Sequence, residues 1–249
     1  MSVHHFAELT WEEVRDLDRA SAVAILPVGA VEAHGPHLPL GTDVLIAEGM
    51  ARVCAEEISR AGHVALILPP VWYTAADFAD NFPGTICVDG AVVTNLVVQI
   101  ATSLREQNIR TLAIANAHLD PAHLTALRQA ADAAPEGSRV VFVDLTKRRV
   151  AEHLTEEFRS GACHAGRFEG SLVLAERPDL FRSEIAAGLE PNPASLSIAI
   201  REGRSTFEES GGPRAYFGWP AAATAEEGHA TLRTLGRMLS AAILDGDTL

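Results

Sequence analysis

Cysteine is scarce in this chain of 249 residues, which has only Cys54, Cys87 and Cys163. An odd number of widely spaced cysteines indicates neither a disulfide framework nor a cysteine-based zinc site. Long hydrophobic runs are also missing, since no apolar stretch approaches the roughly 20 residues that cross a bilayer. The first residues lack the basic region, apolar stretch and cleavage site of a secretory signal. We therefore expect a cytoplasmic protein with no membrane partner.

Positive charge is also in short supply, with 20 Lys and Arg residues against 33 Asp and Glu residues and a formal net charge of −13. The largest basic cluster is the run of three at 147–149. A chain of this charge repels polyanions, so we expect no nucleic-acid partner. No Gly-, Ser- or Pro-rich tract divides the chain, and 47% hydrophobic residues suffice for a large core. These features predict one domain over residues 1–249.

Short apolar runs alternate with amphipathic patterns of helical spacing along most of the chain. The apolar runs predict four strands, at residues 21–28, 63–68, 111–115 and 139–144. The helical patterns predict helices at residues 42–61, 89–107, 121–134 and 224–244. Because parallel strands need crossovers, this alternation predicts the α/β class, with a mostly parallel sheet and helices on both faces. Residues 183–223 are rich in Gly and Pro and fit neither pattern.

Several side chains that can bind metal lie in the segment after the first predicted strand. Glu32, His34, His37 and Asp43 are interspersed there with glycines and prolines. Those residues force a loop, which can fold several side chains around one point. Carboxylate oxygens and imidazole nitrogens together suit Zn, Mn or Fe. The segment therefore predicts a metal site.

Further candidate ligands follow later strands. His118 and Asp120 come after the strand at 111–115, and His164 lies beyond the strand at 139–144. Ligands of open parallel sheets bind beyond the carboxyl ends of the strands. We therefore expect these side chains to meet the loop at one rim of the sheet.

The order and spacing of these residues resemble the creatininase family of amidohydrolases over residues 25–228. The motifs that carry the resemblance are Glu32-Ala33-His34 with Asp43, Phe82-Pro83-Gly84-Thr85, Asn116-Ala117-His118 and His164-Ala165-Gly166. The resemblance implies a creatininase-like fold and hydrolysis of a non-peptide C–N bond, in a cyclic amide or formamide. It also implies a small-molecule substrate and a homo-oligomer, since the family commonly forms hexamers.

The resemblance further implies a ligand set for two divalent metal ions per chain. Glu32 and His118 would hold one ion, His34 and Asp120 the other, and Asp43 would bridge both. Zn and Mn are the expected metals, with Fe as an alternative. Two such ions can share a bridging hydroxide as the nucleophile and polarise the substrate carbonyl.

Three residues near His164 complete the predicted active site. By the same resemblance, His164 is the catalytic histidine, which stabilises the oxyanion or protonates the leaving nitrogen. Glu169 would orient His164 or a metal-bound group. Arg167 stands where the family often has an acidic residue, and it could pair with a carboxylate or phosphate of the substrate.

Some features leave alternatives open. Asp120 immediately precedes Pro121, which is also the pattern of a helix N-cap. Residues 145–168 contain no tryptophan to enclose a flat ring, so creatinine is not the expected substrate. The alternatives are a hydrolase of another small carbonyl substrate, at a C–C or C–O bond, and a noncatalytic metal-stabilised scaffold.

The remaining histidines and acidic pairs are expected to be structural. His37 is interpreted as a residue that supports the site or the packing around it. The pair Glu156-Glu157 is interpreted as a solvated face. Surface or core packing is expected for four other histidines, namely His63, His123, His153 and His229.

Overall fold

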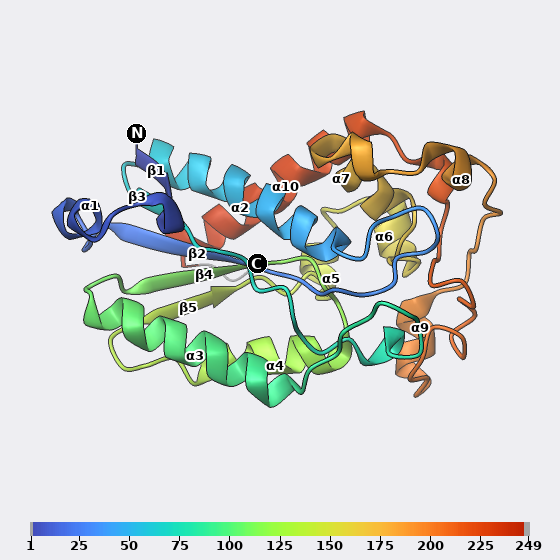
Figure 1. Ribbon diagram of the computed structural model, residues 1–249, viewed down its shortest axis with the longest axis horizontal. Coiled ribbons are helices and arrows are strands. Elements are labelled where there is room, and N and C mark those ends of the chain that lie inside the picture. Colours follow the sequence, from blue (N-terminus) through green and yellow to red (C-terminus); the bar gives the residue numbers. More distant parts are fainter. Residues whose placement is uncertain (1, 247–249) are drawn as a thin grey trace.

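Five parallel strands form one sheet in the order β1-β3-β2-β4-β5 in the computed structural model, which describes residues 2–246 (Figure 1). The strands are β1 Ser2–His5, β2 Ala22–Val28, β3 Val64–Ile67, β4 Thr111–Asn116 and β5 Arg139–Phe142. β2 and β4 pair along six residues, from Val23 opposite Thr111 to Val28 opposite Asn116. This central pair carries most of the site at its carboxyl end.

Helices cover both faces of the sheet (Figure 1). On one face lie α2 Thr42–Arg60, α7 Arg167–Glu176 and α10 Ala225–Leu244; on the other lie α3 Gly90–Glu106 and α4 Pro121–Asp132. Side chains of β2 point alternately to the two faces, so Ile25 packs with Met50 and Leu239, whereas Leu26 packs in the opposite core. Both faces of the strand are buried, which is why its sequence is apolar throughout.

Short elements complete the fold around this layered core. They are α1 Trp11–Asp16, α5 Arg148–Ala151, α6 Glu156–Ser160, α8 Ser183–Ala187, α9 Leu196–Arg201 and the 3-10 turns Phe6–Glu8, Asp77–Ala79, Pro178–Leu180 and Pro220–Ala222. The region expected to be irregular, residues 183–223, thus contains short helices joined by loops. Most of it lies beyond the carboxyl ends of the strands, at the right of Figure 1.

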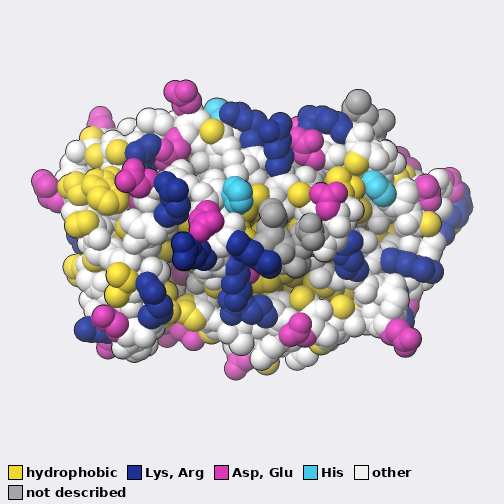
Figure 2. All heavy atoms as spheres, turned by 180° about the vertical axis from the view of Figure 1, so that it is seen from behind, with side chains coloured by type: hydrophobic (Ala, Val, Ile, Leu, Met, Phe, Trp, Pro, Cys, Tyr) yellow, Lys and Arg dark blue, Asp and Glu magenta, His cyan; other side chains and the backbone are white. Residues whose placement is uncertain are grey.

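The predicted α/β fold is confirmed, as are its four predicted strands and its helices on both faces. β1 was not predicted, because a four-residue edge strand containing two histidines has no apolar pattern to mark it. In the part of the chain that the structure describes, no helix is both long and apolar enough to cross a membrane. On the face opposite to that of Figure 1, basic side chains gather across the middle despite the acidic composition of the chain (Figure 2).

The interpretation of Glu157 as a solvated residue is wrong, because its carboxylate is buried at the start of α7. It accepts hydrogen bonds from the backbone N–H groups of Arg167 at 3.0 Å, Phe168 at 2.7 Å and Trp219 at 2.7 Å. Negative charge at the N-terminus of a helix is also favourable. Glu157 therefore joins the turn that follows His164 to the loop at Trp219.

Removing this acceptor is expected to destabilise the protein. Glu157→Ala leaves three backbone N–H groups without their carboxylate, and we expect a loss of about 3 kcal/mol in the free energy of unfolding. Urea unfolding measures the change, and Glu156→Ala is the matched control because Glu156 is exposed in the same helical turn. Equal midpoints for the two variants would contradict this role.

Candidate metal centre

The loop between β2 and α2 folds back on itself, so that Glu32 near its start lies close to Asp43 just after its end. The backbone N–H of Glu32 donates to the carbonyl of Leu40 at 3.0 Å, which closes the loop. Gly29 lies against the first turn of α2, where a Cβ atom would stand 2.5 Å from the backbone nitrogen of Val44. This close approach places Asp43, at the start of α2, beside Glu32.

Six buried side chains from separate segments converge at this point. Three overlapping groups could each hold a metal ion, and the ligand atoms within each group lie within 4.8 Å of one another. The groups are Glu32, Asp43 and His118; His34, Asp43 and Glu169; and Glu32, His34 and His164. Four of the five predicted metal ligands are therefore together, with both predicted catalytic residues beside them.

Asp43 stands between two of the histidines. Its Oδ1 lies 3.3 Å from His34 Nε2, and its Oδ2 lies 3.1 Å from His118 Nδ1. Glu32 Oε1 lies 3.3 Å from the same His118 nitrogen. Each oxygen of Asp43 thus faces a different histidine, which is the arrangement that a bridging carboxylate requires.

Backbone carbonyls orient both histidines. Nδ1 of His34 is 3.1 Å from the carbonyl oxygen of Glu32, and Nε2 of His118 is 2.7 Å from that of Ala75. A carbonyl only accepts, so these nitrogens carry the proton in the neutral rings. The other nitrogen of each ring faces the carboxylates, and it is the nitrogen that could bind a metal ion.

The buried carboxylates of the cluster favour a positive charge beside them. Burial disfavours the charged imidazole, but three nearby carboxylates, led by Asp43, outweigh it and raise the pKa of His34 to about 10. Burial raises the pKa of Glu169 to about 8. Buried atoms without a hydrogen-bond partner in residues 2–246 include Glu32 Oε2, His34 Nε2 and Asp43 Oδ2. Unpaired buried polar atoms are costly, and divalent cations would satisfy this oxygen and nitrogen donor set. The residues present therefore fit a metal site.

His164 lies at the edge of the cluster as a neutral base. Its Nε2 is 2.9 Å from the carbonyl oxygen of Ala33, and its Nδ1 is 3.7 Å from Glu32 Oε1. The ring stacks on Phe207 with centroids 4.2 Å apart. Burial, together with the nearby charge of His34, holds the pKa of His164 well below its usual value. Its Nδ1 is thus available to accept a proton.

Comparison with known proteins identifies the family. The family model of creatininase, described as creatinine amidohydrolase, matches residues 7–243. The chain belongs to the creatininase family. The resemblance noted in the sequence motifs is therefore confirmed, and the family is one of hydrolytic enzymes.

Creatininase-family relatives include proteins of two described activities. A creatinine amidohydrolase of Pseudomonas putida is 34% identical over 70% of this chain and 72% of its own. A mycofactocin precursor peptide peptidase of Mycolicibacterium smegmatis is 30% identical over 86% of this chain and 81% of its own. The family thus includes one protein whose description names a small cyclic amide as the substrate and another whose description names a peptide.

Solved creatininase structures share the fold along the whole chain. A creatininase mutant complexed with creatine has a TM-score of 0.73 at 26% identity, covering 99% of both chains. A structure described as creatininase Mn has a TM-score of 0.70 at 27% identity, again covering 99% of both. The creatininase-like fold is confirmed, and at least one such structure is described with manganese.

Asp120 lies in none of the three metal-binding groups among residues 2–246. Its Oδ1 accepts from the backbone N–H of Ala122 at 2.8 Å, and its Oδ2 accepts from that of Phe78 at 3.1 Å. Asp120 is therefore the N-cap of α4, as the alternative interpretation held. Its role as a metal ligand stays a prediction, and Glu169 occupies the place beside His34, with its Oε2 at 3.7 Å from Nε2.

A cavity of about 770 Å³ opens above the cluster. Its floor includes Glu32, Asp43 and Glu169, and its walls include Phe158 and Phe207. No tryptophan of the described chain lines it. The volume lies within the range of small-molecule sites.

Arg167 lies away from this cavity. Its guanidinium forms an ion pair with Glu227 of α10, and Arg167 is not among the residues that line the cavity. The same helix bears Glu169, whose Oε2 accepts from the backbone N–H of Ala165 at 2.6 Å. The substrate-binding role of Arg167 stays a prediction that the cavity lining does not support.

His123 supports the site, although the sequence interpretation assigned it only to packing. It is fully buried, and its Nε2 is 2.8 Å from Asn116 Oδ1, while Asn116 Nδ2 donates to the carbonyl of His118 at 2.7 Å. His123 therefore helps to hold the turn that bears His118. The position of Asn116 two residues before His118 was the signal that a supporting network exists there.

His37 is buried beside the rings of Phe181 and Tyr216, and neither ring nitrogen has a hydrogen-bond partner within the described residues. Burial, with smaller contributions from His34 and two arginines, lowers the pKa of His37 to about 4. The unfolded chain, with a histidine pKa of about 6.5, then binds a proton more readily than the folded one. The contribution of neutral His37 to the free energy of unfolding is therefore fully present above pH 6.5, and it is lost as the pH falls towards 4.

Removing His37 should therefore flatten the acid limb of the stability curve. When the pH falls from 7 to 4.5, we expect the free energy of unfolding of His37→Phe to decrease by about 2 kcal/mol less than that of the unchanged protein. Urea unfolding at several pH values measures this. His229→Phe is the matched control because His229 is exposed on α10, and parallel curves for the protein and His37→Phe would refute the assignment.

Proposed function

We propose that this protein is a dinuclear metal-dependent amidohydrolase that cleaves a C–N bond of a small amide, in a cyclic amide or formamide. The observation that carries the proposal is Asp43, with one buried oxygen facing His34 and the other facing His118. Glu32 and His118 would hold one ion. His34 would hold the second, with Asp120 or Glu169 as its further ligand.

When bound, two divalent ions supply a Lewis acid for the scissile carbonyl and lower the pKa of water. The protein residues do the remaining work. His164 presents an unprotonated Nδ1 at the cluster, where it can take a proton and then pass it to the leaving nitrogen. Its Nε2 hydrogen bond to Ala33 keeps the ring in this orientation.

Hydrolysis of a peptide bond is the second candidate. It is favoured by the similarity to the mycofactocin precursor peptide peptidase and by a cavity that has room beyond a single small ring. A panel of lactams, formamides, creatinine and short peptides, assayed with Zn-loaded and Mn-loaded protein, separates the two candidates. Metal-dependent turnover of formamides or lactams supports the proposal, and turnover of peptides alone supports the second candidate.

The Asp120→Asn variant tests the second metal position. Asparagine caps helices about as well as aspartate, so the fold of α4 should persist while the negative charge is lost. If Asp120 is a ligand, we expect bound metal to fall from about two ions per chain towards one, measured by plasma mass spectrometry. Unchanged metal content would assign that position to Glu169 instead.

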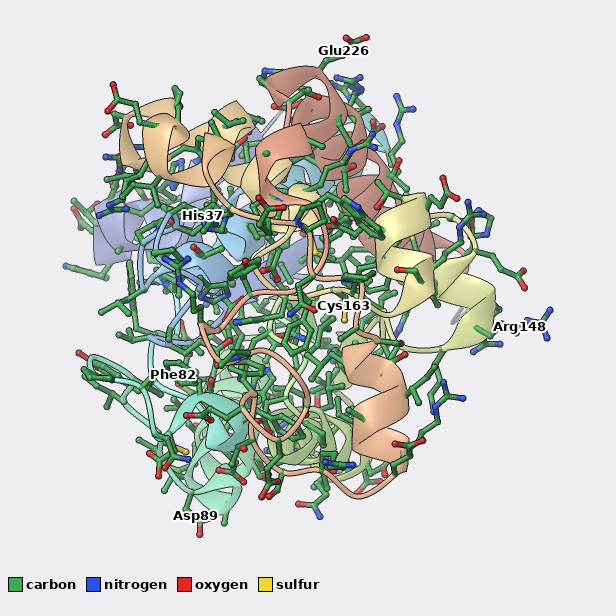
Figure 3. The ribbon with its side chains drawn as sticks, turned by 90° about the vertical axis from the view of Figure 1, so that its right-hand side faces the viewer. His37, Phe82, Asp89, Arg148, Cys163 and Glu226 are labelled. Atoms are coloured by element: carbon green, nitrogen blue, oxygen red, sulfur yellow. The ribbon has the colours of Figure 1, made fainter. Side chains whose placement is uncertain are left out.

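Asp89→Asn is the matched control for this experiment. Asp89 is the N-cap of α3, with its Oδ1 accepting from the backbone N–H of Ala91 at 2.7 Å. Its backbone conformation is almost the same as that of Asp120, but Asp89 lies at the edge of the molecule in Figure 3 and belongs to none of the metal-binding groups among residues 2–246. Asp89→Asn should therefore keep both the metal content and the stability of the unchanged protein.

A further inference from the structure

Arginines line the exposed side of the cavity, in contrast to its acidic floor. They are Arg128 of α4, Arg148 of α5, Arg159 of α6 and Arg201 of α9. Two of them have carboxylate partners. Arg128 Nη2 lies 2.6 Å from Asp144 Oδ2, and Arg148 Nε lies 3.0 Å from Glu152 Oε1. Arg148 also points away from the molecule into solvent (Figure 3).

Arg159 and Arg201 differ from these two arginines. Neither forms an ion pair with an Asp or Glu of residues 2–246. Arg201 Nε donates to the carbonyl of Ser197 at 3.0 Å, which leaves its terminal nitrogens available. A guanidinium is permanently charged and offers two parallel N–H groups that match the two oxygens of a carboxylate. These two side chains are therefore suited to an anion from outside the chain.

The two helices that bear these arginines are joined to each other. Ser195 Oγ donates to the carbonyl of Ser160 at 2.9 Å, and the backbone N–H of Ser197 donates to that of Gly161 at 3.3 Å. Gly161 has φ of +85°, and a Cβ there would meet Ser197 Oγ at 2.2 Å. The end of α6 and the start of α9 thus form one wall, which lies beside Cys163 in Figure 3.

Apolar side chains of the same wall also line the cavity. Phe158 comes from α6, and Leu196 and Ile200 come from α9. A ligand in this cavity therefore meets three environments, which are the metal-ligand cluster, an apolar wall and two unpaired cations. Such a lining selects a molecule with a polar reacting end, an apolar segment and an anionic group.

We propose that Arg159 and Arg201 bind a carboxylate of the substrate, so that the substrate class is amides that also bear a carboxylate beyond an apolar segment. This inference rests on the proposed function, because the metal-ligand cluster defines the reacting end. The chain has a net charge of −13, but salt screens charges that lie more than a Debye length of about 8 Å away. The two nearby arginines can therefore attract an anionic substrate to this cavity.

Hydroxamates with different tails test this proposal by binding alone. The hydroxamate group chelates divalent metal ions, and a dicarboxylic acid monohydroxamate carries a carboxylate at the other end of its chain. We would measure the Kd of such compounds, over a series of chain lengths, and of their methyl esters by calorimetry on Mn-loaded protein. At the best chain length, the acid should bind about tenfold more tightly than its ester.

The double variant Arg159→Gln and Arg201→Gln should abolish this preference while binding the esters as before. Arg233→Gln is the control, because Arg233 is an exposed arginine of α10 that does not line the cavity, and it should keep the preference. Equal affinity of acid and ester at every length, or a preference that survives the double variant, overturns the proposal. If the protein takes up no Mn²⁺ when it is titrated with the metal alone, the metal centre of the proposed function is itself refuted, and this inference with it.

Discussion

Asp43→Asn is expected to remove most of the bound metal and to lower the rate of amide hydrolysis by about 1,000-fold or more. Asp43 is buried, and its two oxygens lie 3.3 Å from His34 Nε2 and 3.1 Å from His118 Nδ1. An asparagine keeps the shape but replaces one of these oxygens with an NH₂ group, which cannot bind a cation. Both metal positions therefore lose a ligand or a charge.

Metal content and turnover measured on the same sample test this expectation. Asp132→Asn serves as the control, because Asp132 is exposed at the far end of α4 and its loss changes the net charge equally. A variant that keeps about two ions per chain would show that Asp43 does not bridge. Loss of both ions with no change in turnover would exclude the metal-dependent mechanism altogether.

His164→Asn is expected to have the second-largest effect, a fall of about 100-fold to 10,000-fold in kcat with the metal retained. The Nδ1 atom of His164 reaches the edge of the cluster, at 3.7 Å from Glu32 Oε1, and the lowered pKa of the ring leaves this nitrogen unprotonated near neutral pH. Asparagine has no group that accepts and releases a proton near neutral pH. The loss should therefore fall on kcat more than on KM.

Metal analysis decides between two roles for His164, because this residue also belongs to one of the three metal-binding groups. Retained metal with low kcat supports proton transfer, whereas loss of an ion would make His164 a ligand. His153→Asn, at an exposed histidine, is the control and should be silent. Unchanged kcat in His164→Asn would remove this residue from the mechanism.

The fold could be predicted where local pattern and tertiary environment agree. β2 and β4 are buried on both faces, so their sequences are continuous apolar runs, and amphipathic helices such as α3 show which side is covered. The edge strand β1 escaped prediction because it pairs with only one neighbour and is too short and polar to show a pattern. The short helices of residues 183–223 escaped because their stability comes from contacts with distant segments rather than from their own periodicity.

The candidate site was predicted in part for the same reason. Glu32, His34 and Asp43 are close in sequence, and His118 and His164 follow strands whose ends meet at one edge. The distances among these groups were beyond the sequence, because they depend on how segments far apart in the chain pack against one another. Asp120 illustrates the difficulty, since the same carboxylate before a proline suits a ligand and a helix cap equally well.

By itself, the sequence determined the α/β class, the family and most of the groups around the metal centre, because apolar periodicity and motif spacing are properties of the linear chain. Only the tertiary structure decided which charges are paired. It buries Glu157 under three backbone N–H groups, pairs Arg167 with Glu227 and leaves Arg159 and Arg201 without a carboxylate partner in the described chain. Charge pairing depends on distance in space and on burial, and neither is written in the order of residues.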